Sequence, residues 1–168
     1  AHATEHALPL HIHACEQRAE IEQSIEEYGK RPLEVFEEAG LFEANTTLVH
    51  ATHLSGEELA ALTRNPRAQV CACPTTERNL GDGFLPATEL LERGVAISLG
   101  SDSHAEIDLW QEMRLVEYHE RLQKERRNVL ASTKIIETWK ALGYTPPRTD
   151  RHEVAPLLWP MATRHGAR

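Results

Sequence analysis

Three polar residues stand at or just after the end of a short apolar segment, and their types are those that bind metals or move protons. His13 ends LPLHIH, His50 ends TLVH, and Asp102 follows VAISL after a Gly-Ser pair. Neutral imidazole and carboxylate groups are ligands that borderline divalent metals accept. Each residue alone has an ordinary structural explanation, a hydrogen-bonded histidine or a helix N-cap. The three together indicate part of a metal site.

The apolar segments alternate with helix-like stretches along the chain. Strands are expected over residues 8–13, 47–50, 68–72 and 95–99. Helices are expected over residues 18–28, 32–39, 57–64, 84–93 and 108–126, with Ser55 and Glu58 spaced as a capping box. Strands that alternate with helices predict parallel βα units. In such folds the carboxyl ends of the strands carry the chemistry, so the three polar residues should meet at one edge.

Composition narrows the function classes. The chain has 168 residues and a net charge of -8, with 40% hydrophobic and 26% charged residues, which fits a soluble globular protein. Its apolar runs are strand-sized, so we expect no membrane span or signal peptide. The acidic balance disfavours a nucleic-acid partner. Three cysteines without zinc-ribbon or redox spacing are interpreted as reduced thiols of a cytoplasmic protein.

The first polar segment contains a second histidine and a nearby carboxylate. His11 and His13 are two residues apart, so on a strand both side chains lie on one face and such a pair can hold a metal. His11 can equally be a core histidine. Glu16 follows three residues after His13, beyond the strand end, where a carboxylate can reach across a bound substrate. His53, just past His50, is expected to support the site or the fold.

Four ordered motifs carry a family resemblance. HACE (13–16), VHATHL (49–54), NLGDGFLP (79–86) and LGSDS (99–103) resemble the amidohydrolase superfamily of metal-dependent deaminases over about residues 7 to 130, and their flanks are most similar to the formimidoylglutamate deiminases. The resemblance implies a (β/α)8 barrel of the TIM type. Since His13 and Asp102 are 89 residues apart and each βα unit takes roughly 30, the chain should hold strands five to eight with their helices, a partial barrel.

The resemblance also implies a function and a role for each site residue. One divalent metal, commonly zinc, is held by His13 and Asp102 together with a first-strand histidine pair that this chain lacks. It lowers the pKa of a bound water. The catalytic residues are Glu16, which moves protons to the leaving nitrogen, His50, which orients the nucleophile, and Asp102, which accepts its proton. His104 is a candidate substrate contact.

The implied reaction is the hydrolytic deimination of N-formimino-L-glutamate to N-formyl-L-glutamate and ammonia, a step of histidine degradation. The substrate is a small molecule, and family members are expected to be homo-oligomers. Because half of the barrel is missing, we expect the isolated chain to be inactive or poorly active. Two alternatives stay open: another deaminase or a chlorohydrolase of the same superfamily, and a non-catalytic remnant that acts through a partner.

The end of the chain departs from the family pattern. We divide the sequence into residues 7–131, the second half of the barrel, and residues 132–168, a divergent tail. One amphipathic helix is expected around residues 135–142, after which Pro146, Pro147, Pro156 and Pro160 should prevent regular structure. We hypothesise that this tail is foreign to the family, for example translated out of frame, or poorly ordered. A lineage-specific extension is the alternative.

Overall fold

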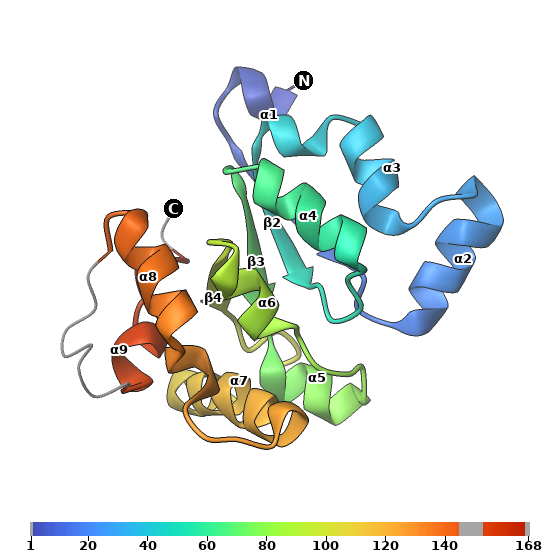
Figure 1. The fold of residues 1–168 in the computed structure, drawn as a ribbon. Coiled ribbons are helices and arrows are strands. Elements are labelled where there is room, and N and C mark those ends of the chain that lie inside the picture. The colour runs from blue at the N-terminus through green and yellow to red at the C-terminus, as the bar shows by residue number, and fades with distance from the viewer. Residues whose placement is uncertain (1, 145–152, 167–168) are drawn as a thin grey trace.

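The computed structural model describes residues 2–144 and 153–166, and its centre is a parallel four-stranded sheet (Figure 1). The strands follow one another in chain order, so each pairs with the next. Their bounds are β1 Pro9–Ala14, β2 Asn45–His50, β3 Ala68–Ala72 and β4 Ala96–Leu99. The predicted α/β class with parallel strands is therefore confirmed. That these are strands five to eight of a barrel stays a prediction.

Most of the helices lie where the sequence indicates. The helices that the sequence predicts are α2 Arg18–Tyr28, α3 Pro32–Glu38, α4 Gly56–Arg64, α6 Ala87–Glu92, α7 Leu109–Lys124 and α8 Thr133–Ala141. The elements that it does not predict are α1 His2–Glu5, α5 Pro74–Leu80, α9 Ala155–Leu158 and the 3-10 turns Leu41–Glu43 and Val129–Ala131. The strand-helix alternation therefore holds throughout the sheet, with α5 as the added helix after β3.

Local sequence signals explain where α4 begins. The Ser55 hydroxyl accepts a hydrogen bond from the Glu58 backbone N–H, and the Glu58 carboxylate accepts one from the Ser55 N–H. This reciprocal pair satisfies two of the N–H groups that every helix start leaves free. Leu59 and Leu62 then point into the core. The capping box predicted from the sequence is confirmed.

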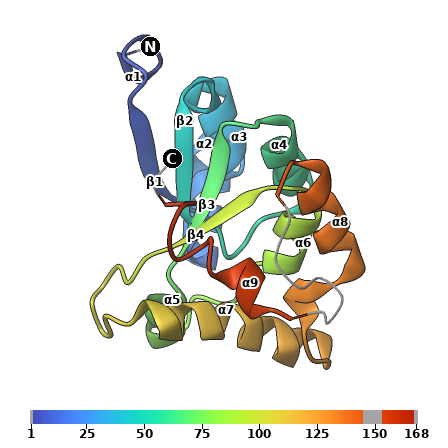
Figure 2. The ribbon, with the colours of Figure 1, turned by 90° about the vertical axis from the view of Figure 1, so that its left-hand side faces the viewer.

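The core lies between the sheet and the helices beside it. Leu48, Val70 and Ile97, on the three strands β2, β3 and β4, have no exposed surface. Burying each side chain contributes roughly 1.5–3 kcal/mol. Figure 2 shows α4, α6 and α8 beside the sheet, while Figures 1 and 2 both place α5 and α7 beyond the ends toward which the strands run. Helices α5 and α7 thus lie next to the carboxyl edge of the sheet.

Three buried glutamates of α7 fasten the neighbouring elements to it. Glu112 accepts hydrogen bonds from the backbone N–H and hydroxyl of Thr75 at the start of α5. Glu120 accepts the same pair from Thr88 at the start of α6. Glu117 accepts two backbone N–H groups of the turn Val129–Ala131. A carboxylate next to the free N–H groups of a helix start is electrostatically favoured, so α7 fixes where α5 and α6 begin.

The described part of the tail packs on the rest of the chain. Ile135, Ile136 and Trp139 of α8 are buried in the core. Near the chain end, the His165 ring stacks on Trp139 at a centroid distance of 5.4 Å, and its Nδ1 donates a hydrogen bond of 2.8 Å to the carbonyl oxygen of Ile97 in β4. Residues 132–144 and 153–166 therefore share the core of the sheet. Whether the tail is foreign to the family stays a prediction.

The prolines of the tail act differently from our expectation at one position. Pro156 lies in the first turn of α9, where its missing N–H is tolerated, so it does not prevent a helix there. Pro160 follows the end of that short helix and lies in a turn. Pro146 and Pro147 lie outside the described residues. The prediction of irregular structure is therefore wrong for residues 155–158.

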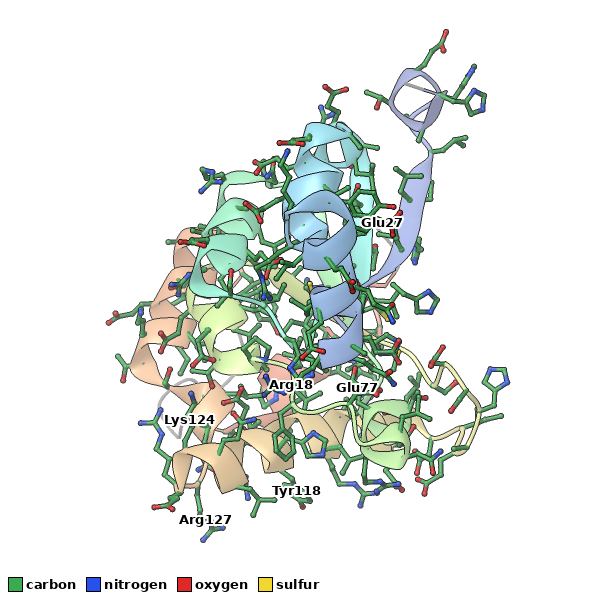
Figure 3. All side chains as sticks on the ribbon, turned by 90° about the vertical axis from the view of Figure 1, so that its right-hand side faces the viewer. Arg18, Glu27, Glu77, Tyr118, Lys124 and Arg127 are labelled. Atoms are coloured by element: carbon green, nitrogen blue, oxygen red, sulfur yellow. The ribbon has the colours of Figure 1, made fainter. Side chains whose placement is uncertain are left out.

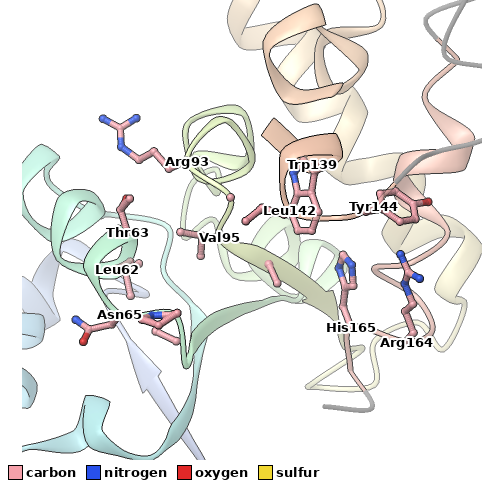
Figure 4. A pocket seen from close by; sticks show the side chains of 14 residues that line it. Leu62, Thr63, Asn65, Arg93, Val95, Trp139, Leu142, Tyr144, Arg164 and His165 are labelled. Atoms are coloured by element: carbon pink, nitrogen blue, oxygen red, sulfur yellow. The ribbon is translucent and has the colours of Figure 1, made fainter. Parts of the chain in front are cut away.

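A cavity of about 360 Å³ opens at the amino ends of β3 and β4, away from the edge where the polar residues meet (Figure 4). Trp139, Tyr144, Arg164 and His165 contribute to its wall.

Within residues 2–144 and 153–166, no helix has the length and apolar character that crossing a bilayer requires.

Candidate metal and catalytic site

The three polar residues that end strand segments meet at the carboxyl edge of the sheet. His13, His50 and Asp102 each offer a ligand atom, and these atoms lie within 4.8 Å of one another. The His13 and His50 rings are stacked at 5.5 Å, and the His50 Nε2 atom lies 3.9 Å from Asp102 Oδ2. The alternative role of Asp102 as a helix cap is not seen, because Asp108 caps α7. Two imidazoles and a carboxylate at this spacing fit a divalent metal.

Glu16 reaches the same cluster from beyond the end of β1. Its Oε1 lies 3.6 Å from His50 Nε2, and 23% of its side chain is exposed. Burial raises the pKa of the Glu16 carboxyl, and the Asp82 carboxylate adds to the rise, while His50 opposes it. A carboxyl group that keeps its proton to higher pH is suited to proton transfer. The structure thus brings together Glu16, His50, His13 and Asp102.

Glu77, for which the sequence indicated no role and which is labelled in Figure 3, contacts the edge of the His50 ring opposite the one that faces Glu16. Its Oε1 lies 3.3 Å from His50 Nδ1, and both side chains are 1% exposed. Burial alone would lower the pKa of His50, but the hydrogen bond with Glu77 and the charges of Glu16 and Asp102 outweigh burial and raise this pKa. The only signal in the sequence was that Glu77 stands beside the NLGDG motif.

The backbone of the site is held in an unfavourable conformation. Five residues at these strand ends have a left-handed φ: Cys15 at 53°, His50 at 71°, Ala51 at 54°, Asp102 at 47° and His104 at 56°. Residues other than glycine rarely adopt such φ values, and each one that does costs of order 1–3 kcal/mol. Strained residues persist only where the surrounding structure holds them in place, and they cluster at functional sites.

Two side chains fix the turn that carries Glu16. The Glu20 carboxylate accepts hydrogen bonds of 2.8 Å from the backbone N–H groups of both Cys15 and Glu16. The Thr52 hydroxyl lies 2.9 Å from the Cys15 carbonyl oxygen and 2.5 Å from that of Glu16, and the His53 backbone N–H also donates to the Cys15 carbonyl at 3.0 Å. All four backbone polar groups of the turn therefore have a partner. This explains how Cys15 keeps its left-handed conformation and where Glu16 points.

A single hydroxyl fixes both neighbours of Asp102. Thr76 Oγ1, on the fully buried side chain of α5, donates to the Ser101 carbonyl oxygen at 3.1 Å and accepts from the Ser103 N–H at 3.1 Å. The Ser103 hydroxyl lies 2.9 Å from the same atom. Asp102 thus projects from a loop held on both sides. Like Glu77, Thr76 belongs to the helix that the sequence did not predict.

His53 supports the loop of residues 81–83 rather than the metal cluster. Its Nε2 donates a hydrogen bond of 2.6 Å to the Asp82 carbonyl oxygen. Gly83 has a φ of 131°, and a Cβ there would lie 3.1 Å from the His53 ring, so a side chain would crowd it. Gln17 Nε2 donates to Asp82 Oδ1 at 2.8 Å. The supporting role expected for His53 agrees with these contacts.

His11 and His104 do not belong to the group of close ligand atoms. His11 is exposed on β1, two residues from His13 and on the same face. His104 is exposed, and its backbone N–H donates to the Ser101 carbonyl oxygen at 3.3 Å. The substrate contact expected for His104 stays a prediction.

Comparisons with known proteins agree with this arrangement. The family model "Amidohydrolase family" matches residues 1–138. The formimidoylglutamate deiminase of Pseudomonas aeruginosa is 42% identical over 123 residues, which are 73% of this chain and 27% of that protein. The 5-methylthioadenosine/S-adenosylhomocysteine deaminase of Caldanaerobacter subterraneus is 34% identical over 96 residues, 57% of this chain and 22% of that protein.

Two solved structures share the fold. The amidohydrolase from Brucella melitensis has a TM-score of 0.73 and 35% identity, and the match covers 95% of this chain and 32% of that one. An adenosine deaminase from Xanthomonas campestris with bound zinc has a TM-score of 0.71 and 27% identity over 84% of this chain and 34% of that one. This chain therefore spans about a fifth to a third of the length of these relatives. With a family model that matches 138 of its 168 residues, the chain belongs to the amidohydrolase family.

Proposed function

We propose that this chain is the second half of the (β/α)8 barrel of a metal-dependent enzyme that deiminates N-formimino-L-glutamate. The observation that carries the proposal is the meeting of His13, His50 and Asp102 at the carboxyl edge of the sheet, with Glu16 beside them. The choice of substrate is supported by the relative that is 42% identical, a formimidoylglutamate deiminase. Because the chain spans 27% of that protein, the activity is proposed for the complete barrel.

His13 and Asp102 would hold the metal, which we take to be zinc. Their ligand atoms lie within the 4.8 Å group, so the residues present fit such an ion. When bound, the metal supplies a Lewis acid that makes water nucleophilic near neutral pH. With His50 assigned to the attacking water and not to the metal, one histidine and one carboxylate remain, fewer than the three protein ligands of a typical catalytic zinc site. Further ligands would come from a histidine pair on the first strand, outside this chain.

The chain's own residues would handle the protons of the reaction. Water adds its oxygen to the formimino carbon, the bond from that carbon to the terminal nitrogen breaks, and the nitrogen leaves as ammonia. Asp102 would take a proton from the attacking water, and His50 Nε2 would orient that water. Glu16, with its raised pKa, would deliver a proton to the departing nitrogen. The formyl group stays on the glutamate nitrogen.

A second candidate is another deaminase of the same family. The deaminase of Caldanaerobacter subterraneus, named for 5-methylthioadenosine and S-adenosylhomocysteine, is 34% identical over 96 residues. The four site residues handle water and a leaving nitrogen, and these steps are the same for an amidine and for an aminopurine. The residues that choose between the substrates would lie in the missing half.

Ammonia release tests the proposal. The chain is assayed with zinc, alone and fused behind the complementary N-terminal part of the Pseudomonas aeruginosa relative, with N-formimino-L-glutamate or S-adenosylhomocysteine as substrate. We expect release from N-formimino-L-glutamate by the fusion only. Asp102→Asn should abolish it, whereas Asp108→Asn should not, because asparagine also caps helices well. Deamination of S-adenosylhomocysteine alone would favour the second candidate, and activity unaffected by Asp102→Asn would refute both.

A further inference from the structure

Glu77 is a buried carboxylate that the proposed chemistry does not use. It lies on α5, directly after β3, between the strand that ends in His50 and the strand that leads to Asp102. Its side chain folds back so that Oε1 accepts the Cys73 backbone N–H at 2.8 Å. Cys73 is the N-cap residue of α5, so the carboxylate lies beside the positive end of that helix. The position of Oε1 is therefore fixed by the backbone.

The same oxygen faces the ring of His50. The distance from Oε1 to Nδ1 is 3.3 Å, and neither side chain is more than 1% exposed. A carboxylate accepts hydrogen bonds and donates none, so the contact is attractive only when Nδ1 carries a proton. The opposite nitrogen, Nε2, faces the carboxylates of Glu16 and Asp102 at 3.6 and 3.9 Å. The two ring nitrogens of His50 thus have separate surroundings.

Helix capping alone does not explain a carboxylate at position 77. Capping requires one acceptor for the Cys73 N–H, yet the second oxygen, Oε2, is buried with no partner among the described residues. A buried polar atom without a partner costs about 1–3 kcal/mol. A hydroxyl side chain, which has a single oxygen, would avoid this cost. The negative charge of Glu77 is explained if the carboxylate interacts with the neighbouring His50 imidazole.

We infer that Glu77 is a positioning residue that keeps the proton of neutral His50 on Nδ1 and leaves Nε2 unprotonated, able to accept a hydrogen bond from water in the site. Carboxylates that fix the tautomer of an active histidine in this way orient the ring and favour its charged form. The tautomer itself follows from the geometry alone. Its value for turnover rests on the proposed function, because only there does Nε2 act on water.

Nitrogen-15 NMR of the imidazole rings tests the inference on the whole chain, without metal or substrate. The His50 signal is assigned by its loss in His50→Gln. In the wild type we expect protonated Nδ1 and unprotonated Nε2 once the ring is neutral. Glu77→Ala removes the acceptor, so the proton should move to Nε2, where two carboxylates can accept it. A wild-type ring with its proton on Nε2, or an unchanged tautomer in Glu77→Ala, would overturn the inference.

Two further variants separate positioning from general support of the helix. In Glu77→Gln the Cys73 N–H keeps a carbonyl oxygen at the Oε1 position, so the tautomer should persist while the Nδ1–H proton signal moves upfield as the charge-assisted bond weakens. An unmoved proton signal would contradict the inference even if Glu77→Ala does not fold. Glu112→Ala removes a buried carboxylate of α7 that contacts the start of α5, and it should leave the tautomer of His50 unchanged. A tautomer change there would assign the effect to the helix.

Discussion

Replacing Thr76 by valine should weaken zinc binding although Thr76 touches no metal ligand side chain. The Thr76 hydroxyl holds the Ser101 carbonyl and the Ser103 N–H, and its side chain is fully buried. Each lost neutral hydrogen bond costs about 1 kcal/mol, so Thr76→Val should lower the free energy of unfolding by about 1–2 kcal/mol. Once released, Asp102 can leave its left-handed φ of 47°, a conformation that costs of order 1–3 kcal/mol.

Zinc binding must then restore that strained conformation. Since 1.4 kcal/mol corresponds to a tenfold change in affinity, calorimetric titration should show a zinc Kd roughly ten times higher in Thr76→Val. Thr76→Ser is the matched control, because it keeps the hydroxyl and removes a methyl worth about 0.8 kcal/mol. It should lose stability in urea but keep the wild-type affinity. Equal affinities in Thr76→Val and the wild type would refute the idea that this hydroxyl positions Asp102.

Three other outcomes are expected. Glu20→Ala should lower the free energy of unfolding by about 1–2 kcal/mol in urea, because two backbone N–H groups lose their acceptor; an unchanged urea midpoint would contradict the role of Glu20 in fixing the turn of Glu16. Iodoacetamide at neutral pH should modify Cys71 before Cys15 in mass spectra, since a hydrogen bond with Cys73 lowers the pKa of Cys71 while burial raises that of Cys15. Burial raises the pKa of Glu120 in the folded chain above its value in the unfolded chain. Glu120 therefore contributes its full stabilisation at pH values below the unfolded pKa, and this contribution is lost as the pH rises through the folded pKa. The stability of Glu120→Gln relative to the wild type should therefore increase from about pH 4 to pH 7, and parallel urea curves would argue against it.

The sequence predicts the strand ends well because two simple regularities meet there. Apolar segments of four to six residues separated by helical stretches define parallel strands, and parallel strands place their carboxyl ends at one edge. His13, His50 and Asp102 can therefore be grouped from the sequence alone, and their ligand atoms do lie within 4.8 Å of one another. Glu16 was recognised from its spacing to His13, and it lies 3.6 Å from His50.

The residues that hold this group in place could not be predicted in the same way. Helix α5 is seven residues long and opens with Pro74 and two threonines, which are weak helix formers. Its start is held by hydrogen bonds from Thr75 to Glu112, 37 residues later in the chain. Local helix propensity depends on nearby residues and therefore does not reveal that contact. Because α5 was missed, the roles of Thr76 and Glu77 toward Asp102 and His50 were missed with it.

The site divides into a part that this chain completes and a part that it does not. Each residue proposed to act on the water or on the leaving nitrogen is already fixed: Glu20 and Thr52 hold the turn of Glu16, Glu77 contacts the His50 ring, and the neighbours of Asp102 are also bonded. These contacts offset the strained backbone without help from outside the chain. The metal, by contrast, has two proposed ligands here, fewer than a catalytic zinc site requires. The isolated chain should therefore keep the geometry of its acid and base groups and bind zinc weakly. Adding the strands proposed to complete the barrel should change the metal affinity more than the tautomer of His50.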